Sequence, residues 1–503
     1  MTKRHVVLTW RNAALAMGMS LMLAGCAVGP DYQRPAPPLT RMYTPEGPLS
    51  ATAAAPGKDG QAQQFIAGMD IPGQWWTLFQ SLSLNGLIDD AIKNNPDLAA
   101  AQQALRQAIE NVRAQRGQYD PQVSAGINAT RQKTGQVLSS GIASNDTLYN
   151  LTTAQLSISY VPDVWGENRR QVESLVAQAD QQRFQVEATY LTLTSNLVNA
   201  AVQEASLRAQ IASTQDMIHS QTTILGTTRK QRALGDASES DVATQEAALE
   251  QTRATLPPLQ KQWAQQRDLL AMLTGRTPDQ RVQANFSMDS LQLPQQLPLS
   301  VPARLVEQRP DVRMADSQLH AACAQVGVAF AARLPNIDIT AAWGSATDQM
   351  HTLFGAGTGF WNIGAAIAAP IFDGGTLKHK QRAAEAAYRQ AAEQYRSTVL
   401  SALQNVADTL HALEIDADAV AIAVHGEEAA EHSYTIAQHQ YALGDISMVA
   451  LLNAQITYRQ AELTLIQARA ARYADTVALF QALGGGWWNR HDVVLSHQSG
   501  SKM

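Results

Sequence analysis

One series of sequence landmarks occurs twice in this chain, and the duplication limits the folds available to it. Pro310 follows Pro96 by 214 positions, and Pro335 follows Pro121 by the same distance. A repeat of this length, with its landmarks in one order, predicts two copies of one structural unit. The matching segments are Asn-Pro-Asp-Leu at 95–98 with Arg-Pro-Asp-Val at 309–312, Pro-Asp-Val-Trp-Gly at 162–166 with Pro-Ile-Phe-Asp-Gly at 370–374, and Gln-Arg-Ala-Leu-Gly-Asp at 231–236 with Gln-Tyr-Ala-Leu-Gly-Asp at 440–445.

Each copy contains a stretch in which apolar residues alternate with polar or small ones. In the first copy this pattern runs through Val123 and Ile127 and resumes at Leu156, which predicts a β-hairpin over about 122–161. The second copy repeats the pattern over about 336–371. Aromatic residues stand near the strand ends, where membrane strands carry an aromatic girdle. They are Tyr119, Tyr160, Trp165, Trp343, Phe360 and Trp361.

A helical pattern of great length follows each pair of strands. From Gly166 it lasts about 60 residues, or about 90 Å at 1.5 Å per residue. Apolar positions alternate by four and three from Val186 to Leu225, and again from Val399 to Val424. A heptad sustained this far predicts coiled-coil packing, and both its length and its duplication argue against the alternative, a helix of a large soluble bundle. Each long helix turns and returns, so we expect helical hairpins over about 166–275 and 376–483.

The first 25 residues have the features of a lipoprotein signal peptide. Lys3, Arg4 and Arg11 precede a short apolar stretch, which ends in Leu-Ala-Gly and then Cys26. This resembles a bacterial lipobox, in which cleavage exposes Cys26 for acylation, and Ala27 rather than Asp resembles the outer-membrane sorting rule. The alternative is an ordinary signal peptide with an incidental cysteine. Cleavage removes three positive charges, so the mature chain carries −9 instead of −6.

The remaining boundaries follow from composition. Residues 26–70 are rich in Pro, Ala, Gly and Gln and predict an acylated N-terminal tether. The two copies occupy 71–275 and 304–488, a segment at 276–303 joins them, and 489–503 forms a polar tail that we expect to be flexible. With Cys26 acylated, Cys323 has no disulfide partner within the chain and is interpreted as a packing residue.

Several functions are excluded by what the sequence contains. No basic cluster accompanies the formal charge of −6, so nucleic acid is not expected as a partner. There is no glycine-rich nucleotide loop and no His-Glu-x-x-His motif, so we expect neither an enzyme nor an ATP site. His425, His432 and His439 stand seven apart on a predicted helix, about 10 Å between neighbours, which is too far to share a metal. The covalent lipid on Cys26 is the only prosthetic group expected.

The two strand pairs predict a membrane structure that one chain cannot complete. The mature chain contains no transmembrane helix pattern, yet each copy offers two strands with an apolar face. Strands in lipid must close into a barrel because open edges leave backbone groups unsatisfied. Four strands cannot close a barrel wide enough for a pore. We therefore expect a mainly α-helical protein that shares a membrane β-barrel between several copies.

Together with Trp75 and Trp76, the paired segments resemble the TolC-like outer membrane factors of bacterial efflux systems, specifically the lipoprotein branch typified by NodT and OprM. The resemblance covers nearly all of residues 70–488. It implies a homotrimer with a twelve-stranded outer-membrane barrel and a twelve-helix periplasmic tunnel. It also implies an exit duct that is anchored in outer membrane lipid and reached through a periplasmic adaptor from a proton-driven inner-membrane pump.

The resemblance also assigns residues to the periplasmic helix tips, where the duct closes and the adaptor docks. The turns would permit positive φ at Gly235 and Gly444. Asp241 matches an acidic position of the family's first tip. The tip and adaptor-contact set is Leu234, Gly235, Asp236, Asp241, Leu443, Gly444 and Asp445.

For the constriction, Tyr441 matches a tyrosine that links helices in the closed state of some members. Where some members carry an acidic ring, this chain has Ala450 and Asn453, so a cation-trapping ring is not expected. Asp445, or an apolar collar that includes Met448, Leu451 or Leu452, could constrict the duct instead. Ordinary capping or packing is the alternative role for each of these residues.

The leading functional hypothesis is a passive efflux duct for drugs or other small toxic compounds. An exit duct for type I protein secretion uses the same architecture and is the nearest alternative. A structural periplasmic coiled-coil lipoprotein is a third possibility, although it would have no need of strands with apolar faces. A metal-efflux duct lacks a clear Met or His site at the tips.

Overall fold

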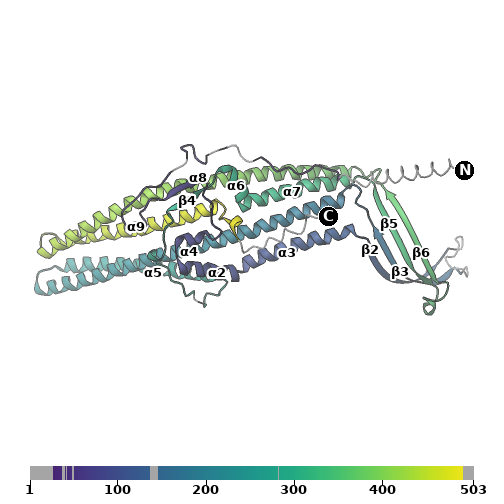
Figure 1. Cartoon of the computed structure of the whole chain (residues 1–503). Coiled ribbons are helices and arrows are strands. Elements are labelled where there is room, and N and C mark those ends of the chain that lie inside the picture. The colour runs from purple at the N-terminus through teal and green to yellow at the C-terminus, as the bar shows by residue number, and fades with distance from the viewer. Residues whose placement is uncertain are drawn as a thin grey trace. The chain divides into compact units, whose positions relative to one another are not determined.

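The computed structural model describes residues 27–36, 40, 42–47, 50–135, 146–280 and 282–490. The predicted signal peptide and Cys26 lie outside the described residues. The described chain is mainly helical, and its elements follow one another as Figure 1 shows. They form two compact units. Of the described residues, the first, called the sheet unit, contains those within 27–35, 104–182 and 315–395, and the second, the hairpin unit, contains those within 36–103, 183–314 and 396–490.

The two halves of the chain contain corresponding elements in one order. The first half has α2 (Leu82–Asn94), α3 (Pro96–Arg116), β2 (Gln122–Lys133), β3 (Leu148–Tyr160), α4 (Glu167–Leu234) and α5 (Glu239–Leu273). The second half has α6 (Pro302–Gln308), α7 (Pro310–Ala331), β5 (Asn336–Thr347), β6 (Gly359–Ala368), α8 (Thr376–Leu443) and α9 (Met448–Ala482). The long helices α4 and α8 both have 68 residues, and α5 and α9 both have 35.

Two of the three repeated motif pairs mark helix starts. Pro96 and Pro310 are the first residues of α3 and α7, where a missing N–H costs nothing. Asp163 accepts hydrogen bonds from the backbone N–H groups of Asn168 and Arg169 at 3.0 and 2.8 Å, and thereby caps α4. Asp373 caps α8 in the same way, through two backbone N–H groups at 2.8 Å.

The sheet unit is built around four antiparallel strands in the order β2-β3-β5-β6. Their register brings the apolar residues of all four strands to one face. Ile158 stands beside Val123 on β2 and Ala341 on β5, and Ala341 in turn stands beside Ile363 on β6. The opposite face carries mainly polar side chains, including Gln122, Ser157, Thr340 and Asn362.

The N-terminal strap, residues 27–35, packs against the helices of the sheet unit. The buried guanidinium of Arg170 on α4 donates to the carbonyl oxygens of Val28 and Gly29 at 3.2 and 3.4 Å and pairs with Asp31 at 2.7 Å. Further along, the ring of Tyr32 stacks on His320 of α7 with 4.3 Å between ring centroids. This part of the predicted tether is therefore held against α4 and α7 by specific contacts. The sequence did not predict them, because single hydrogen bonds and ion pairs leave no periodic pattern.

In the hairpin unit, residues of the same predicted tether form a strand. β1 (Gln64–Ala67) pairs in parallel with β4 (Gln296–Leu299), which lies in the segment between the copies. The fully buried Arg472 of α9 holds the preceding loop through Thr52, the Asp59 carbonyl, the Gln61 carbonyl and Gln63. The aromatic core of the unit includes Trp75, Trp76, Phe79, Tyr473 and Phe480.

Two helical hairpins complete the hairpin unit. The C-terminal part of α4 pairs with α5, and the C-terminal part of α8 pairs with α9 (Figure 1). Helix α4 continues through Gly226 and ends at Leu234, so that its 68 residues exceed the length of about 60 expected from the sequence. Among the described residues, no helix combines the length and apolar character that crossing a membrane requires.

The described end of the chain differs from the flexible tail expected from residue 489. Asn489 donates to Asp70 and to the Ile71 carbonyl, both at 2.8 Å. The Arg490 guanidinium pairs with Glu187 at 2.8 Å and lies 3.5 Å from the ring centroid of Tyr190. Both ends of the Arg490–Glu187 pair are buried, so these two residues belong to the packed unit.

Candidate functional site: an exposed apolar sheet and two helix tips

The apolar face of the sheet is open to its surroundings. Trp343 and Trp361 stand directly opposite each other and are 67% and 74% exposed, and Ile363 is 72% exposed. An apolar area of this kind on a folded chain marks a surface that meets lipid or another protein. The outer strands β2 and β6 each pair on one side only within the described residues. Their free edges need a further strand.

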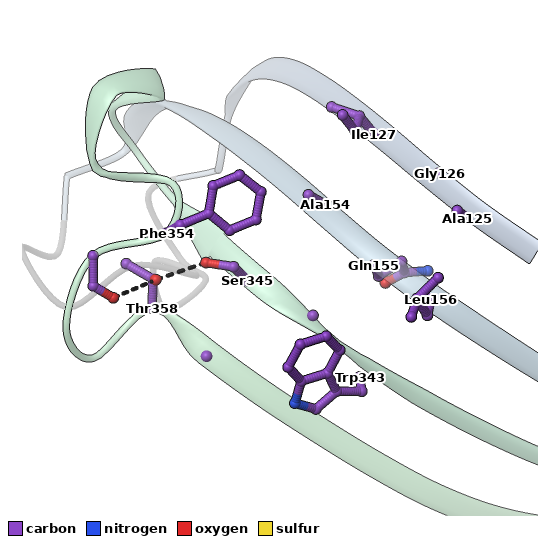
Figure 2. A pocket seen from close by; sticks show the side chains of 13 residues that line it. Ala125, Gly126, Ile127, Ala154, Gln155, Leu156, Trp343, Ser345, Phe354 and Thr358 are labelled. Atoms are coloured by element: carbon purple, nitrogen blue, oxygen red, sulfur yellow. Dashed lines mark hydrogen bonds between the residues drawn. The ribbon is translucent and has the colours of Figure 1, made fainter.

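The loop between β5 and β6 folds over this face and leaves a hollow of about 530 Å³ (Figure 2). Ser345 donates to the Thr358 hydroxyl at 2.6 Å, and Thr358 donates to the Gly355 carbonyl at 2.8 Å, which fixes the loop. Figure 2 shows the ring of Phe354 beside the sheet, with Trp343 further along the strands. Among the described residues, none of the side chains that line the hollow is charged.

Both helix hairpins end in the same turn. Gly235 and Gly444 have φ of +90° and +83°, which only glycine adopts without strain. In the first turn the Gly235 and Asp236 N–H groups donate to carbonyls of α4 at 3.0 and 2.8 Å, and the second turn has the same two bonds at 3.0 and 2.9 Å. This is the Schellman closure of a helix C-terminus. It leaves Leu234 and Leu443 78% and 77% exposed at the tips.

Asp241, expected at an adaptor contact, caps α5. Its carboxylate accepts from the Ser238 N–H at 2.9 Å and from the Ser238 hydroxyl at 2.7 Å, while its own N–H donates to Ser238 Oγ at 3.1 Å. These hydrogen bonds from the Ser238 side chain and backbone hold the pKa of Asp241 below its usual value. At the second tip Ser447 caps α9 alone, because Ala450 stands where a reciprocal acid would be.

The constriction candidates fall into two groups. Met448 and Leu451 are buried together with Leu452 in a cluster that also contains Ile224 of α4 and Ala248 of α5. In this structure they therefore fill the contact between the two hairpins. Ala450 and Asn453 are exposed, and Asp445 is exposed at the turn. The Tyr441 hydroxyl, half-buried, donates to the Gln231 side chain of the other hairpin at 3.3 Å.

Further polar contacts between the hairpins were not predicted from the sequence. The Arg459 guanidinium on α9 donates to the Gln210 carbonyl on α4 at 3.1 Å, to the Thr214 hydroxyl and to Glu462 at 3.0 Å. Glu462 in turn accepts from Ser213 of α4. The sequence held one signal for these contacts, since Thr214 occupies a core position of the heptad where an apolar residue is usual.

Nearer the tip, a second polar cluster joins the hairpins. Gln455 donates to the hydroxyls of Ser220 and Tyr434 at 3.2 and 3.3 Å, and these two hydroxyls lie 3.3 Å apart. The tips are therefore held by several separate hydrogen bonds and one apolar cluster. Within the described part of the chain, no three His, Cys or acidic side chains gather as a metal ion would require.

Solved structures of outer-membrane proteins share this fold. The outer-membrane channel OprN is 26% identical with a TM-score of 0.81, over 92% of this chain and 100% of that one. VceC of Vibrio cholerae, an outer membrane protein, is 25% identical with a TM-score of 0.76, over 83% of this chain and 100% of that one. The fold, the exposed apolar sheet and these similarities therefore define an outer-membrane channel.

The chain belongs to the outer membrane efflux protein family, whose model matches residues 87–276 and 301–485. The pyoverdine export protein OpmQ of Pseudomonas putida is 28% identical over 477 residues, which cover 93% of this chain and 96% of that protein. The toluene efflux pump protein TtgC of P. putida is 29% identical over 480 residues, covering 94% and 95%. CusC of Escherichia coli, a cation efflux protein, is 26% identical over 473 residues, covering 93% and 97%.

Proposed function

We propose that this efflux channel is the passive outer-membrane exit duct of a tripartite system. The observation that carries the proposal is the four-stranded sheet, with one exposed apolar face and two unpaired edges. Three copies, each adding four strands, would pair the edges of β2 and β6 in a twelve-stranded barrel whose apolar faces meet lipid. The same threefold arrangement would assemble the four long helices of each copy into a tunnel of twelve.

The exposed tips are the surface that we assign to the periplasmic adaptor. Leu234 and Leu443 project from rigid turns, and Asp236 and Asp445 add a charge beside each of them. Exposed apolar side chains on a fixed turn offer an anchor for a partner helix. An inner-membrane pump, in our proposal a proton-driven one, supplies the energy, and the duct itself performs no chemical step.

The substrate class that we propose is small toxic compounds. The names of the relatives mention pyoverdine, toluene and cations, at 26–29% identity to this chain. Cargo thus varies among proteins of one architecture, which suits a duct whose selectivity resides in the pump. The described tips of this chain hold no cluster of metal ligands that would favour cations.

We also propose that Cys26 carries the lipid. The N-terminal strap supports this assignment, because Ala27 lies against Gly166 at the start of α4. A Cβ on Gly166 would come within 2.7 Å of the Ala27 Cα atom. The strap thus begins beside the end of β3, on the side of the sheet unit where membrane strands give way to helices.

The proposal is tested by expressing the protein in a host that lacks other efflux ducts and measuring growth with antibiotics, dyes, detergents and aromatic acids. Restored resistance to small compounds supports the proposal. A matched control is Arg253→Met, which alters only a surface ion pair within α5. Protein present in the outer membrane as a trimer, with no gain of resistance to any compound, would instead favour protein secretion. A monomer there would refute the duct.

A further inference from the structure

The hollow beneath the loop between β5 and β6 lies on the apolar face of the sheet, the face that we assign to the membrane. Its volume of about 530 Å³ falls within the range of pockets that hold small molecules, roughly 300–1,000 Å³. Two neighbouring rows of paired strand residues form its floor. One row contains Ile127, Ala154, Ser345 and Gly359, and the next row toward the helices contains Ala125, Leu156 and Trp343.

Two large aromatic side chains border the hollow and remain exposed. Phe354 of the loop is 82% exposed and Trp343 is 67% exposed, and the two rings are separated along the strands (Figure 2). The loop that carries Phe354 is fixed to the sheet, because the Ser345 hydroxyl donates to the Leu353 carbonyl. Exposed aromatic rings on a fixed surface offer a large apolar area to a ligand.

The polar side chains that line the hollow bond within the chain. Ser345 also donates to Thr358 at 2.6 Å, Thr358 donates to the Gly355 carbonyl at 2.8 Å, and the Gln155 amide donates to Ser157 at 3.1 Å. A charged ligand would lose its hydration in this hollow without meeting an opposite charge, whereas an alkyl chain would only leave water. The lining therefore favours a hydrocarbon chain.

Two basic residues continue the same face beyond the hollow. Arg131 and Lys133 follow Ile127 on β2 by four and six positions, so alternation places all three on one face of the strand. Both are exposed. At about 3.3 Å per residue, Arg131 lies about 13 Å and Lys133 about 20 Å beyond Ile127. We call Arg131 and Lys133 the basic pair. An apolar hollow followed by positive charge suits a ligand with a hydrocarbon chain and an anionic head.

The connections of the strands indicate which end of the sheet carries this site. Helices α3 and α7 lead into β2 and β5, and β3 and β6 lead into α4 and α8, so all four helices attach at one end of the sheet. The loop between β5 and β6 and the basic pair stand toward the opposite end. In the proposed duct the helices extend into the periplasm, so the opposite end reaches the outer leaflet. The outer leaflet consists of lipopolysaccharide, whose lipid A anchor joins saturated acyl chains to a phosphorylated sugar.

We propose that the hollow and the basic pair form a binding site for the phosphorylated glycolipid of the outer leaflet, with an acyl chain in the hollow and a phosphate at Arg131 and Lys133. The proposal rests on the proposed function, since the direction of the helices sets the leaflet. Phe354 and Trp343 would contact the chain, and the two cations would pair with the phosphate. A lipid held in this way should stay with the protein when the surrounding membrane is dissolved.

The ligand class is tested by native mass spectrometry of the full-length, detergent-purified protein, titrated with bisphosphorylated lipid A. The trimer should retain up to one lipid A per copy. Dephosphorylated lipid A and phosphatidylglycerol should bind several-fold more weakly. Equal binding of phosphatidylglycerol would overturn the glycolipid assignment, and equal binding of dephosphorylated lipid A would overturn the role of the basic pair. Trimers that retain no lipid A would overturn the site, whereas a monomeric wild-type protein would refute the duct on which it rests.

The hollow is tested by filling it. Ala125 is exposed in its floor, so Ala125→Trp should weaken the binding of lipid A several-fold. Its control is Ala365→Trp, an equally exposed alanine on the same face that stands two rows nearer the helices and does not line the hollow. If Ala125→Trp prevents trimers, Phe354→Ala replaces it, because that change only removes an exposed ring. Trimers of the Ala125 or Phe354 variant that bind lipid A as well as the control would overturn the hollow as the acyl site.

The basic pair is tested by changing Arg131 and Lys133 together to Gln. Removing two charges that each attract an anionic headgroup should weaken the binding of lipid A roughly 30-fold. The control changes Lys378 and Lys380 to Gln, which removes the same charge from exposed positions near the start of α8, at the other end of the sheet. Lipid A binding by the control should match the wild type. Equal binding by both double variants would overturn the phosphate contact.

Discussion

Removal of Arg459 is the change that most directly tests whether polar contacts hold the two hairpins together. Arg459 is 9% exposed, and its guanidinium donates across the hairpins to the Gln210 carbonyl at 3.1 Å and to Thr214. Hydrogen bonds made by a charged group contribute about 1.5–3 kcal/mol net. We therefore expect Arg459→Met to weaken the joined arrangement by about 2–3 kcal/mol, which is roughly a 30- to 150-fold shift toward parted hairpins.

The assay is single-channel conductance of the purified trimer in planar bilayers, where parted tips should raise both conductance and the fraction of time spent open. Arg253→Met is the matched control, because its ion pair with Glu250 is exposed and confined to α5, and such pairs contribute about 0–1 kcal/mol. Circular dichroism and thermal melting establish that both variants fold. If folded Arg459→Met trimers conduct like the wild-type protein, the hairpin contact does not control the opening.

Three further changes test other parts of the structure. Gly444→Val should lower the stability of the turn by about 1–2 kcal/mol, because a valine at φ of +83° is strained, while no atom lies within 4 Å of the new Cβ. Trimers should persist on size exclusion while resistance falls. Normal resistance would contradict the tip assignment. Ser238→Ala should speed amide exchange at the start of α5. It should also remove the stability that Asp241 contributes at neutral pH and loses as pH falls through its depressed pKa, so that wild type and variant converge in acid. Burial and the neighbouring Asp475 raise the pKa of Asp416 to about 7, so wild-type stability should fall as pH rises from about 4 to 7. Asp416→Asn should then raise the melting temperature at pH 8 more than at pH 5, and an equal gain at both would contradict the shift.

Much of the secondary structure could be predicted from local sequence patterns, because strands, turns and helix caps depend on residues that are close together in the sequence. The alternation around Val123 and Ile158 predicted strands, since residues two apart share a face of any strand. The glycine at each Leu-Gly-Asp predicted a turn, because a helix that ends in a left-handed residue needs one. The aspartates of the repeated motifs cap helices through backbone groups only a few residues away. Such interactions depend on near neighbours in sequence, so the order of residues suffices to find them.

Contacts between distant segments could not be predicted in this way. Nothing in the composition of the predicted tether indicates that Arg170 would bind residues 28–31. Nor does it indicate that β1 would pair with β4, which lies 232 positions further along the chain. The partners of Arg459 and Tyr441 are likewise set by how two hairpins face each other. A single guanidinium or hydroxyl group produces no repeating sequence pattern from which its partner could be predicted.

The sequence by itself determined the two copies, their strands, their long helices and the family resemblance, because repetition and heptads persist over many residues. Only the tertiary structure decided which constriction candidates are buried, with Met448 and Leu451 inside the hairpin contact and Ala450 and Asn453 outside it. It also showed that one side of α8 packs within the chain while the histidine side stays open. A heptad pattern predicts that a helix packs against other helices. How many helices it contacts, and on which of its sides, depends on which helices lie near it in the folded chain.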